Sequence, residues 1–208
     1  VSATDSILST ADATAASVSI AAGFAANALA ISAAVASTSL AGTTRAGIGS
    51  SRVRANTGEL TVVANAESEV ITTPDAYAIS AAIGFGGAQA AAGASATNTV
   101  TRITEAFVRD VSDARALVGL MTIEAHDRIS ATADVNALAI GVAPLAMAAG
   151  VALAENTITT VTTASVEDST VESGGGDLLI DADSVQGAGD VITRADVDAL
   201  ALGIGGAA

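Results

Sequence analysis

Apolar and polar side chains alternate along most of this chain, with the period of an extended strand. Between residues 16 and 24, Ala16, Val18 and Ile20 fall on one strand face, and Ser17 and Ser19 fall on the other. Threonine-rich runs favour strands because β-branched side chains pack well on a pleated surface. The recurrent glycines would each cost a helix about 1 kcal/mol relative to alanine. The pattern therefore predicts an all-β chain. Where both faces are apolar or small, it predicts strands buried on both sides.

The alternation is itself repeated at a fixed interval of roughly 60 residues, a period typical of repeat architectures. A glycine-anchored strand at 58–64 returns at 119–125 and at 176–182. Val1-Ser2-Ala3 fits as the end of an earlier copy. Such self-similarity is typical of arrays in which each copy completes the core of its neighbour. The sequence therefore predicts one continuous array with approximate repeats 1–57, 58–118, 119–175 and a partial repeat 176–208.

Matches at further phases predict which residues stack between copies. A ladder of asparagines is expected at Asn98 and Asn156, where side-chain amides satisfy backbone groups along the array. Equivalent anchor positions are expected to form one core column, at Val62, Ile123 and Ile180. A recurrent aspartate is expected to mark one corner of the coil, at Asp75, Asp134 and Asp196. The pattern leaves open whether a repeat forms about three small coils or one large coil.

The two ends of the chain favour a piece of a larger protein. The chain begins at Val1 without a methionine and ends at Ala208, inside a block of small residues. We therefore expect the array to continue on both sides, with no linker inside it. The absence of a signal peptide carries no weight in such a piece.

Composition and charge narrow the class of protein. Half of the residues are apolar, yet aromatic residues make up only 2%, so the core is expected to be thin. The net charge is −14, and all 8 basic residues are arginine. Such an acidic chain repels phosphate groups and anionic lipids, so nucleic acid is not expected as a partner. The chain has no cysteine, which is compatible with secretion.

Three long uncharged segments raise a membrane-spanning alternative. They cover residues 18–44, 76–101 and 137–154, and 18 apolar residues approach the length of a spanning helix. The segments consist mostly of alanine, glycine and serine, and Pro144 interrupts one of them. No basic cluster flanks them to set an orientation. Strands in register with the array are therefore favoured over membrane insertion.

The repeat resembles that of a known family. Its unit combines the strand Gly-Asp-Leu-Leu-Ile-Asp-Ala at 176–182, an Ala/Gly-rich block, Asn-Thr-Ile-Thr at 156–159 and the close Ala-x-Val-x-Asp-Ser-x-Val at 164–171. In these features the chain resembles bacterial filamentous-haemagglutinin-like and leukotoxin-type surface exoproteins, which are large adhesins, over essentially its whole length. The resemblance implies a right-handed parallel β-solenoid, secretion to the surface of a Gram-negative bacterium, and a role in adhesion or as a surface filament. It carries over no catalytic residue.

Few residues suggest chemistry of their own. His126 is the only histidine, and a single histidine without cysteine does not make a zinc site of the usual kind. Asp177, Asp181 and Asp183 lie in a segment faintly similar to calcium-binding nonapeptides, so they are weak candidates for Ca²⁺. Solvated acidic residues that discourage sticking are the favoured interpretation. We expect no catalytic and no cofactor-binding residue.

The sequence therefore predicts a structural or adhesive segment of an extracellular protein, forming a stiff stalk or filament. Its expected partner is a further copy or a cell-surface neighbour. One alternative is a β-helix enzyme acting on polysaccharides, which would need clustered polar residues and long insertions. A second is an ice-binding solenoid, suggested by threonine runs that include Thr99, Thr101 and Thr104 and residues 157–163. Ice-binding solenoids present Thr-x-Thr at a short coil period, whereas these runs return once per repeat.

Overall fold

Each turn of the solenoid is one repeat, built of two long strands and one short strand. The computed structural model describes residues 1–111 and 113–203, without the side chains of residues 186–190, so the last five residues of the fourth predicted repeat lie outside it. The first coil contains β1 (Ser2–Ala22), β2 (Ala28–Gly49) and β3 (Arg52–Ala55); the second contains β4 (Leu60–Ile83), β5 (Gly87–Arg109) and β6 (Asp113–Ala116); the third contains β7 (Met121–Ala143), β8 (Leu145–Glu167) and β9 (Val171–Ser173); and β10 (Leu178–Gly203) begins a fourth.

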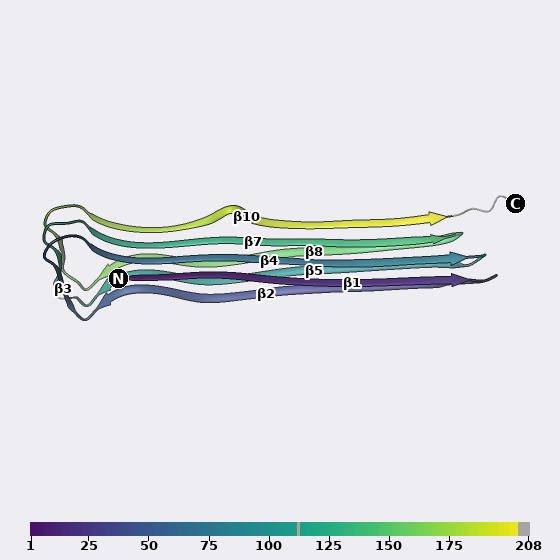
Figure 1. Cartoon of the computed structure of the whole chain (residues 1–208), viewed down its shortest axis with the longest axis horizontal. Helices are drawn as coiled ribbons and strands as arrows, with labels where there is room; N and C mark the ends of the chain where they lie inside the picture. Colours follow the sequence, from purple (N-terminus) through teal and green to yellow (C-terminus); the bar gives the residue numbers. More distant parts are fainter. Residues whose placement is uncertain (112, 204–208) are drawn as a thin grey trace.

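Equivalent strands of successive coils pair in parallel and form three sheets. Sheet A has the order β1-β4-β7-β10, sheet B the order β2-β5-β8 and sheet C the order β3-β6-β9. Sheets A and B are two long layers, and the short sheet C closes one end (Figure 1). We call this the sheet C end, and the opposite end, where β1, β4 and β7 turn into β2, β5 and β8, the distal end. The described residues contain no helix, so the predicted all-β parallel β-solenoid is confirmed.

The strand register confirms the glycine-anchored repeat. Val62 lies opposite Ile123, and Ile123 lies opposite Ile180, so the predicted core column is present. Asn98 lies opposite Asn156 on sheet B. One repeat is therefore one large coil rather than three small ones.

The predicted column of aspartates is wrong. Asp75 and Asp196 both lie opposite Asn136, whereas Asp134 lies opposite Arg194, and all of them lie within strands. Asp134 therefore precedes the true partner of Asp75 by two positions along β7. In β10 a register shift between Gln186 and Val191 displaces the rest of that strand relative to β7, so the spacing at the anchor does not hold beyond it.

The interior changes along the length of the strands. Toward the sheet C end the core contains large aliphatic side chains, among them Leu60, Val62, Val108, Met121 and Ile123. Toward the distal end it consists almost entirely of alanine, including Ala34, Ala78, Ala92, Ala137 and Ala139. Alanine side chains let two sheets approach more closely than the usual spacing of about 10 Å. The expected thin core is thus confined to the distal part.

The outer faces of the distal strands are apolar and exposed. Val18 and Ile20 point outward and are 66% and 71% exposed, whereas Ser17 and Ser19 point inward. The prediction that these strands are buried on both sides is wrong, because no third layer covers sheet A or sheet B within the described residues. The uncharged segments form strands and turns, and none of the described residues belong to a helix that could span a membrane.

Glycine is required in the distal turns, where successive coils stack closely. Gly84 has a φ of 125°, and an added Cβ would overlap the carbonyl oxygen of Gly23 in the coil beside it. The rings of Phe24 and Phe85 pack against each other at these turns, with centroids 5.4 Å apart and planes inclined by 58°. The distal rim is therefore tight, aromatic and free of charge.

Candidate functional site

An asparagine ladder crosses the interior midway along the long strands. The Asn98 amide nitrogen donates to the Asn156 side-chain oxygen and to the Thr132 carbonyl oxygen, both at 2.8 Å. The Asn156 amide nitrogen donates in turn to the Ile192 carbonyl oxygen at 2.7 Å. The Thr72 hydroxyl donates to the Asn98 side-chain oxygen. The ladder therefore joins neighbouring coils and both sheets, which is the structural role expected for these asparagines.

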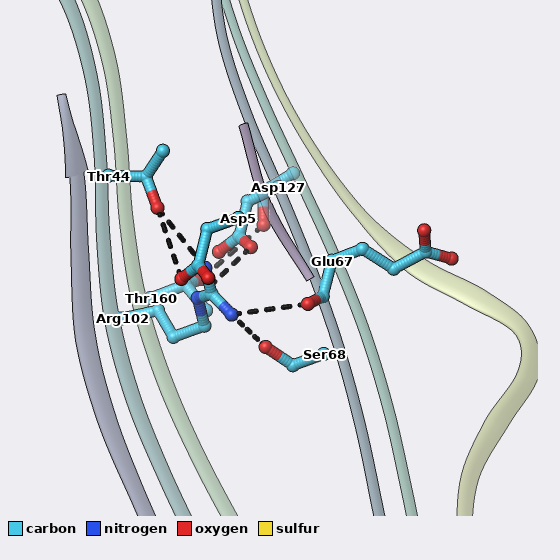
Figure 2. A network of polar contacts seen from close by, with 8 residues as sticks. Asp5, Thr44, Glu67, Ser68, Arg102, Asp127 and Thr160 are labelled. Carbon is cyan, nitrogen blue, oxygen red and sulfur yellow. Dashed lines mark hydrogen bonds and ion pairs between the residues drawn. The ribbon is translucent and has the colours of Figure 1, made fainter. Parts of the chain in front are cut away.

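A second polar layer, nearer the sheet C end, is built around Arg102. The Arg102 side chain is fully buried, with Nη2 3.1 Å from an oxygen of Asp5 and Nε 3.8 Å from an oxygen of Asp127. Its Nη1 donates to the Ser68 hydroxyl and, at 3.4 Å, to the Glu67 carbonyl oxygen. Figure 2 shows both carboxylates close to the guanidinium. One buried cation thus faces two carboxylates.

The two carboxylates come from the coils on either side of Arg102. On sheet A, Asp5 lies opposite Ala66, which lies opposite Asp127. On sheet B, Arg102 lies between Gly42 and Thr160. Because Ala66 in the arginine's own coil is small, the guanidinium reaches Asp5 in the first coil and Asp127 in the third. Because Arg102 pairs with one carboxylate from the coil on each side, the triad favours a stack in which the second coil lies between the first and the third.

Asp127 is the least satisfied member of the triad. Its side chain is fully buried, and neither carboxylate oxygen has a hydrogen-bond partner among the described residues. Burial raises the pKa of Asp127, and the attraction of Arg102 opposes this rise only in part. Chemically, the site can hold a proton, but the Arg102 and Asp127 side chains are enclosed between the sheets, and only Asp5, on the edge strand β1, is partly exposed. We assign it a structural role.

The outer face of sheet A carries a shallow polar hollow near the same level. It has a volume of about 280 Å³, and its lining includes Asn65, Glu67, His126, Arg128 and Asp183. Thr4 of the first coil also lines it, and Asn65 lies opposite His126 and His126 opposite Asp183, so all four strands of sheet A contribute to it. The His126 Nε2 atom lies 3.6 Å from a Glu124 oxygen on the same strand. His126 is thus a partly exposed surface residue, and the hollow is open to solvent.

The calcium candidates lie on β10 and in the turn before it. Asp181 lies opposite Glu124 and Asp183 opposite His126, so the two aspartates share the outer face of sheet A. The Asp177 carbonyl oxygen accepts a hydrogen bond from the Met121 N–H at 3.1 Å. Among the residues that the structure describes, no three histidine or acidic side chains converge closely enough to hold a metal ion. The calcium hypothesis gains no support from this geometry.

Most of the positive charge is already paired. Within the described residues, at least seven of the eight arginines lie within 4.0 Å of a carboxylate, which leaves little free cationic surface for an anionic ligand. The hydrogen bond from Arg54 lowers the pKa of Asp113, and the hydrogen bond from Arg109 lowers the pKa of Glu167. These pairs link neighbouring coils, because Arg54 and Asp113 lie on β3 and β6.

The outer face of sheet B presents threonines in its middle section. Thr99 lies opposite Thr157, and Thr101 lies opposite Thr159. All four side chains point outward, whereas Thr104 and Thr162 point inward. Because one repeat is one coil, these threonines lie on two adjacent strands, whereas the first coil has Ser39 and Ala41 at the paired positions. The objection that they return only once per repeat therefore does not hold.

The Arg102 triad is the site that the sequence analysis missed. The alternation alone carries the signal, since Arg102 falls on the same strand face as Val100 and Thr104, and Asp127 on the same face as Ala125 and Ile129. A charged residue at a core position predicts a buried partner. Pairing the two residues required the register of both sheets, which the sequence does not show.

Comparison of the chain with protein-family models, with curated proteins and with solved structures finds no match in any of the three.

Proposed function

We propose that this chain is a structural repeat module of an extracellular surface protein. The module forms a broad, stiff surface that is used in adhesion or filament formation. The resemblance to large bacterial adhesins supports the extracellular location. The shape of the coil supports the proposal that the module forms a broad surface.

One observation carries the proposal: the long strands of a coil are far longer than the distance by which each coil advances the solenoid. A strand of 23 residues such as β5 spans about 75 Å, whereas each added coil advances the solenoid by only about 4.8 Å. Each coil therefore adds little length, but it adds a long strip to the outer face of sheet A and another to sheet B. Added coils of this kind increase the flat surface area much more than they increase the length along the solenoid axis. We therefore favour a plate or ribbon over a slender stalk.

The interior supports the same conclusion. The buried polar groups of the asparagine ladder and of the Arg102 triad contact neighbouring coils, which fixes coil stacking rather than aiming groups at a substrate. The hollow beside His126 is shallow and lacks an enclosing wall, whereas catalysis needs several groups converging on a sheltered position.

Microscopy combined with an activity screen tests the proposal. Negative-stain images of the purified chain should show elongated particles about 75 Å long and about 15–20 Å across, as the strand length and the four strands of sheet A require. Incubation with pectin-, alginate- and chitin-type polymers, with and without Ca²⁺, should show no turnover. Polymer cleavage that is abolished by Asp183→Asn, a substitution in the hollow, would contradict the proposal and favour a β-helix enzyme.

The threonine surface favours ice binding as a second candidate function. Thr99, Thr101, Thr157 and Thr159 form an outward, in-register array on adjacent strands, about 4.8 Å apart between strands. Measurement of thermal hysteresis is the direct test. A freezing-point gap that is lost in Thr99→Lys and retained in Thr73→Lys, on the outer face of sheet A, would support it. No gap at all would exclude it.

A further inference from the structure

The distal turns place large apolar side chains at the far end of every complete coil. In the described part of the chain, the three most exposed large hydrophobic residues are Phe24, Phe85 and Leu145, at 84%, 79% and 74%. Phe24 and Phe85 lie in the turns after β1 and β4, and Leu145 begins β8 directly after Pro144. Each of the three coils thus contributes one such residue to the end opposite sheet C (Figure 1).

The turns themselves carry almost no polar side chains, although surface turns ordinarily favour Asn, Asp and Ser besides Gly and Pro. Residues 23–27, 84–86 and 144 consist of glycine, alanine, phenylalanine and proline, with Asn27 as the one polar residue. The Asn27 side-chain oxygen accepts a hydrogen bond from the Gly87 N–H at 3.1 Å, so it serves the backbone of the next coil. The side chains of the rim therefore offer water little to hydrogen-bond.

The apolar surface continues from the rim onto both outer faces. On sheet A it includes Ile20 and Ile83, which are 71% and 67% exposed. On sheet B it includes Leu29 and Met147, which are 57% and 61% exposed, with the polar Gln89 on β5 between them. Because the two outer faces lie on opposite sides of the molecule, the apolar area surrounds a projecting end. It is neither a groove nor a single flat patch.

Charged residues lie away from this end. The chain is uncharged over residues 13–44, 76–101 and 135–154, and each of these runs passes through a distal turn. The charged residue closest to a distal strand end is Asp198, on the outer face of sheet A, about 17 Å along β10 from Gly203. No arginine lies nearer, so the distal end has no attraction for anionic lipid.

Shape and charge identify a lipid bilayer as the partner of this end. The rim measures only about 15 Å by 20 Å, or roughly 300 Å², as four strands at about 4.8 Å and two sheets with their side chains require. A protein interface needs about 800 Å² from each partner, so a folded protein would need a slot complementary to the rim and to both faces. A bilayer is fluid and surrounds a projecting apolar end without a preformed slot. Phenylalanine and leucine are also typical of segments that bury an apolar face at the boundary of head groups and acyl chains.

We propose that the distal end inserts into the surface of a bilayer of zwitterionic lipid, with Phe24, Phe85 and Leu145 deepest. The inference rests on the proposed function for its extracellular setting, and it deepens that function by naming a lipid surface as the partner. Depth is limited, because the outer edges of β1 and β10 pair with no further strand in the described residues, and unpaired backbone groups require water. Insertion therefore stops about 5–10 Å deep. The long strands then stand upright on the membrane, and the sheet C end points away from it.

Tryptophan fluorescence tests the contact, because the chain contains no tryptophan of its own. Phe85→Trp places a single reporter at the rim. Val118→Trp places one in a turn at the sheet C end, where Val118 is 63% exposed. With phosphatidylcholine vesicles, the emission of Phe85→Trp should shift to shorter wavelength and should be quenched by lipids brominated on their acyl chains. The emission of Val118→Trp should not change.

Vesicle flotation measures the contribution of the two rings. Phe24→Ser/Phe85→Ser should weaken the affinity for phosphatidylcholine vesicles about 100-fold or more, because two rings leave the lipid. Leu117→Ser/Val118→Ser removes two exposed apolar side chains from the opposite end and should bind as the wild type does. Added salt should not weaken binding, because no basic residue lies at the distal end. Circular dichroism and urea unfolding confirm that each variant is folded.

Other outcomes overturn the inference. A shift of Phe85→Trp emission with protein concentration alone, together with concentration-dependent species in analytical ultracentrifugation, would indicate a second copy at the rim. Binding only to anionic vesicles with Ca²⁺, unchanged in Phe24→Ser/Phe85→Ser, would indicate ion bridging through acidic residues. A wild type that does not float with vesicles would refute the contact. That failure would leave the proposed function standing, whereas polymer cleavage would remove that function whatever the vesicle result.

Discussion

The two ends of the long strands distribute their apolar side chains in opposite ways. Toward the sheet C end, large residues such as Val62 and Ile123 are fully buried, and the outer face of sheet A carries charged residues such as Glu67 and Arg128. Toward the distal end, alanines fill the core and the large residues, such as Val18 and Ile20, lie outside. The same two sheets thus bury their large apolar side chains at the sheet C end and expose them at the distal end.

The difference teaches that side-chain size, rather than hydrophobicity, decides which face of these strands lies inside. In the distal half alanine fills almost all of the space between the sheets, and the larger aliphatic residues lie on the surface. An exposed apolar area of this size usually marks an interaction surface. The sheet C end therefore holds the large-residue core, whereas the distal end exposes most of its large apolar side chains.

The sharpest way to break this comparison is to place the same charge at both ends. Ile123→Asp introduces an unpaired carboxylate into the large-residue core and should destabilise the chain by more than about 4 kcal/mol. Ile79→Asp introduces the same group on the distal outer face and should change the free energy of unfolding by less than about 1 kcal/mol. Urea denaturation followed by circular dichroism measures both. Equal losses would show that the distal outer face is buried after all.

The Arg102 triad belongs to the interior of the sheet C half, and its removal should have the next largest effect. Arg102→Met leaves Asp127 without its cation and should destabilise the chain by about 3–5 kcal/mol. The double variant Arg102→Met/Asp127→Asn should recover much of this loss, because the remaining charge is gone from that position. Chemical denaturation of the single and double variants gives the coupling energy. Additive losses would mean that the two side chains do not interact.

Overpacking tests the distal alanine core. Ala78→Leu adds three carbon atoms to a fully buried position in the alanine core and should destabilise the chain by about 1–3 kcal/mol. Ala81→Leu, on the outer face of the same strand, should be nearly neutral. Thermal and urea unfolding compare the two. A neutral Ala78→Leu would indicate that the distal sheets have room to spare.

The smallest expected effect is a difference in pH dependence between an inner and an outer carboxylate. Burial raises the pKa of Asp127 in the folded state, so the folded chain binds more protons there, and stability falls as pH rises above the unfolded value of about 3.9. Asp127→Asn should therefore gain stability relative to wild type as pH rises from about 4 to 7. Unfolding midpoints measured across this range provide the test.

Asp113 should behave in the opposite way. Arg54 lowers its pKa, so its contribution is present above the unfolded pKa and is lost as pH falls through the lower folded pKa. Asp113→Asn should lose stability relative to wild type near neutral pH, and the difference should shrink in acid. If both variants shifted in the same direction, the distinction between inner and outer carboxylates would be refuted.

The sequence predicted the fold class well because its two periods have direct physical meaning. Alternation predicted strands, and the glycine-anchored repeat predicted the stacking of Val62, Ile123 and Ile180. It did not reveal which strand face lies inside, since period two defines two faces without ordering them. One inner column, Ala15, Ala76 and Ala137, is alanine in three coils, and that constancy was the available signal.

The interior charges could be predicted only in part. The alternation places Arg102 and Asp127 on core faces, but they lie on different sheets, and their contact depends on a register between coils. The same dependence explains the misplaced aspartates, because a shift of two residues keeps a side chain on its face while moving it to another column. The sequence pattern thus predicts which residues share a strand face more reliably than which residues they contact.

The spacing of the paired strands has a consequence for how the chain folds. Every β-ladder pair in the described residues joins positions roughly 60 residues apart, about 0.3 of the chain length, and no hairpin there brings neighbouring strands together locally. Two-state β-proteins with mean relative separations of about 0.16–0.22 already fold in milliseconds to seconds. The first coil has no existing strand edge on which to pair, so the folding nucleus must contain two coils. The entropy lost in closing loops of this length opposes the formation of that nucleus. Each later coil then adds to an existing edge, which makes initiation the slow step and growth the fast one.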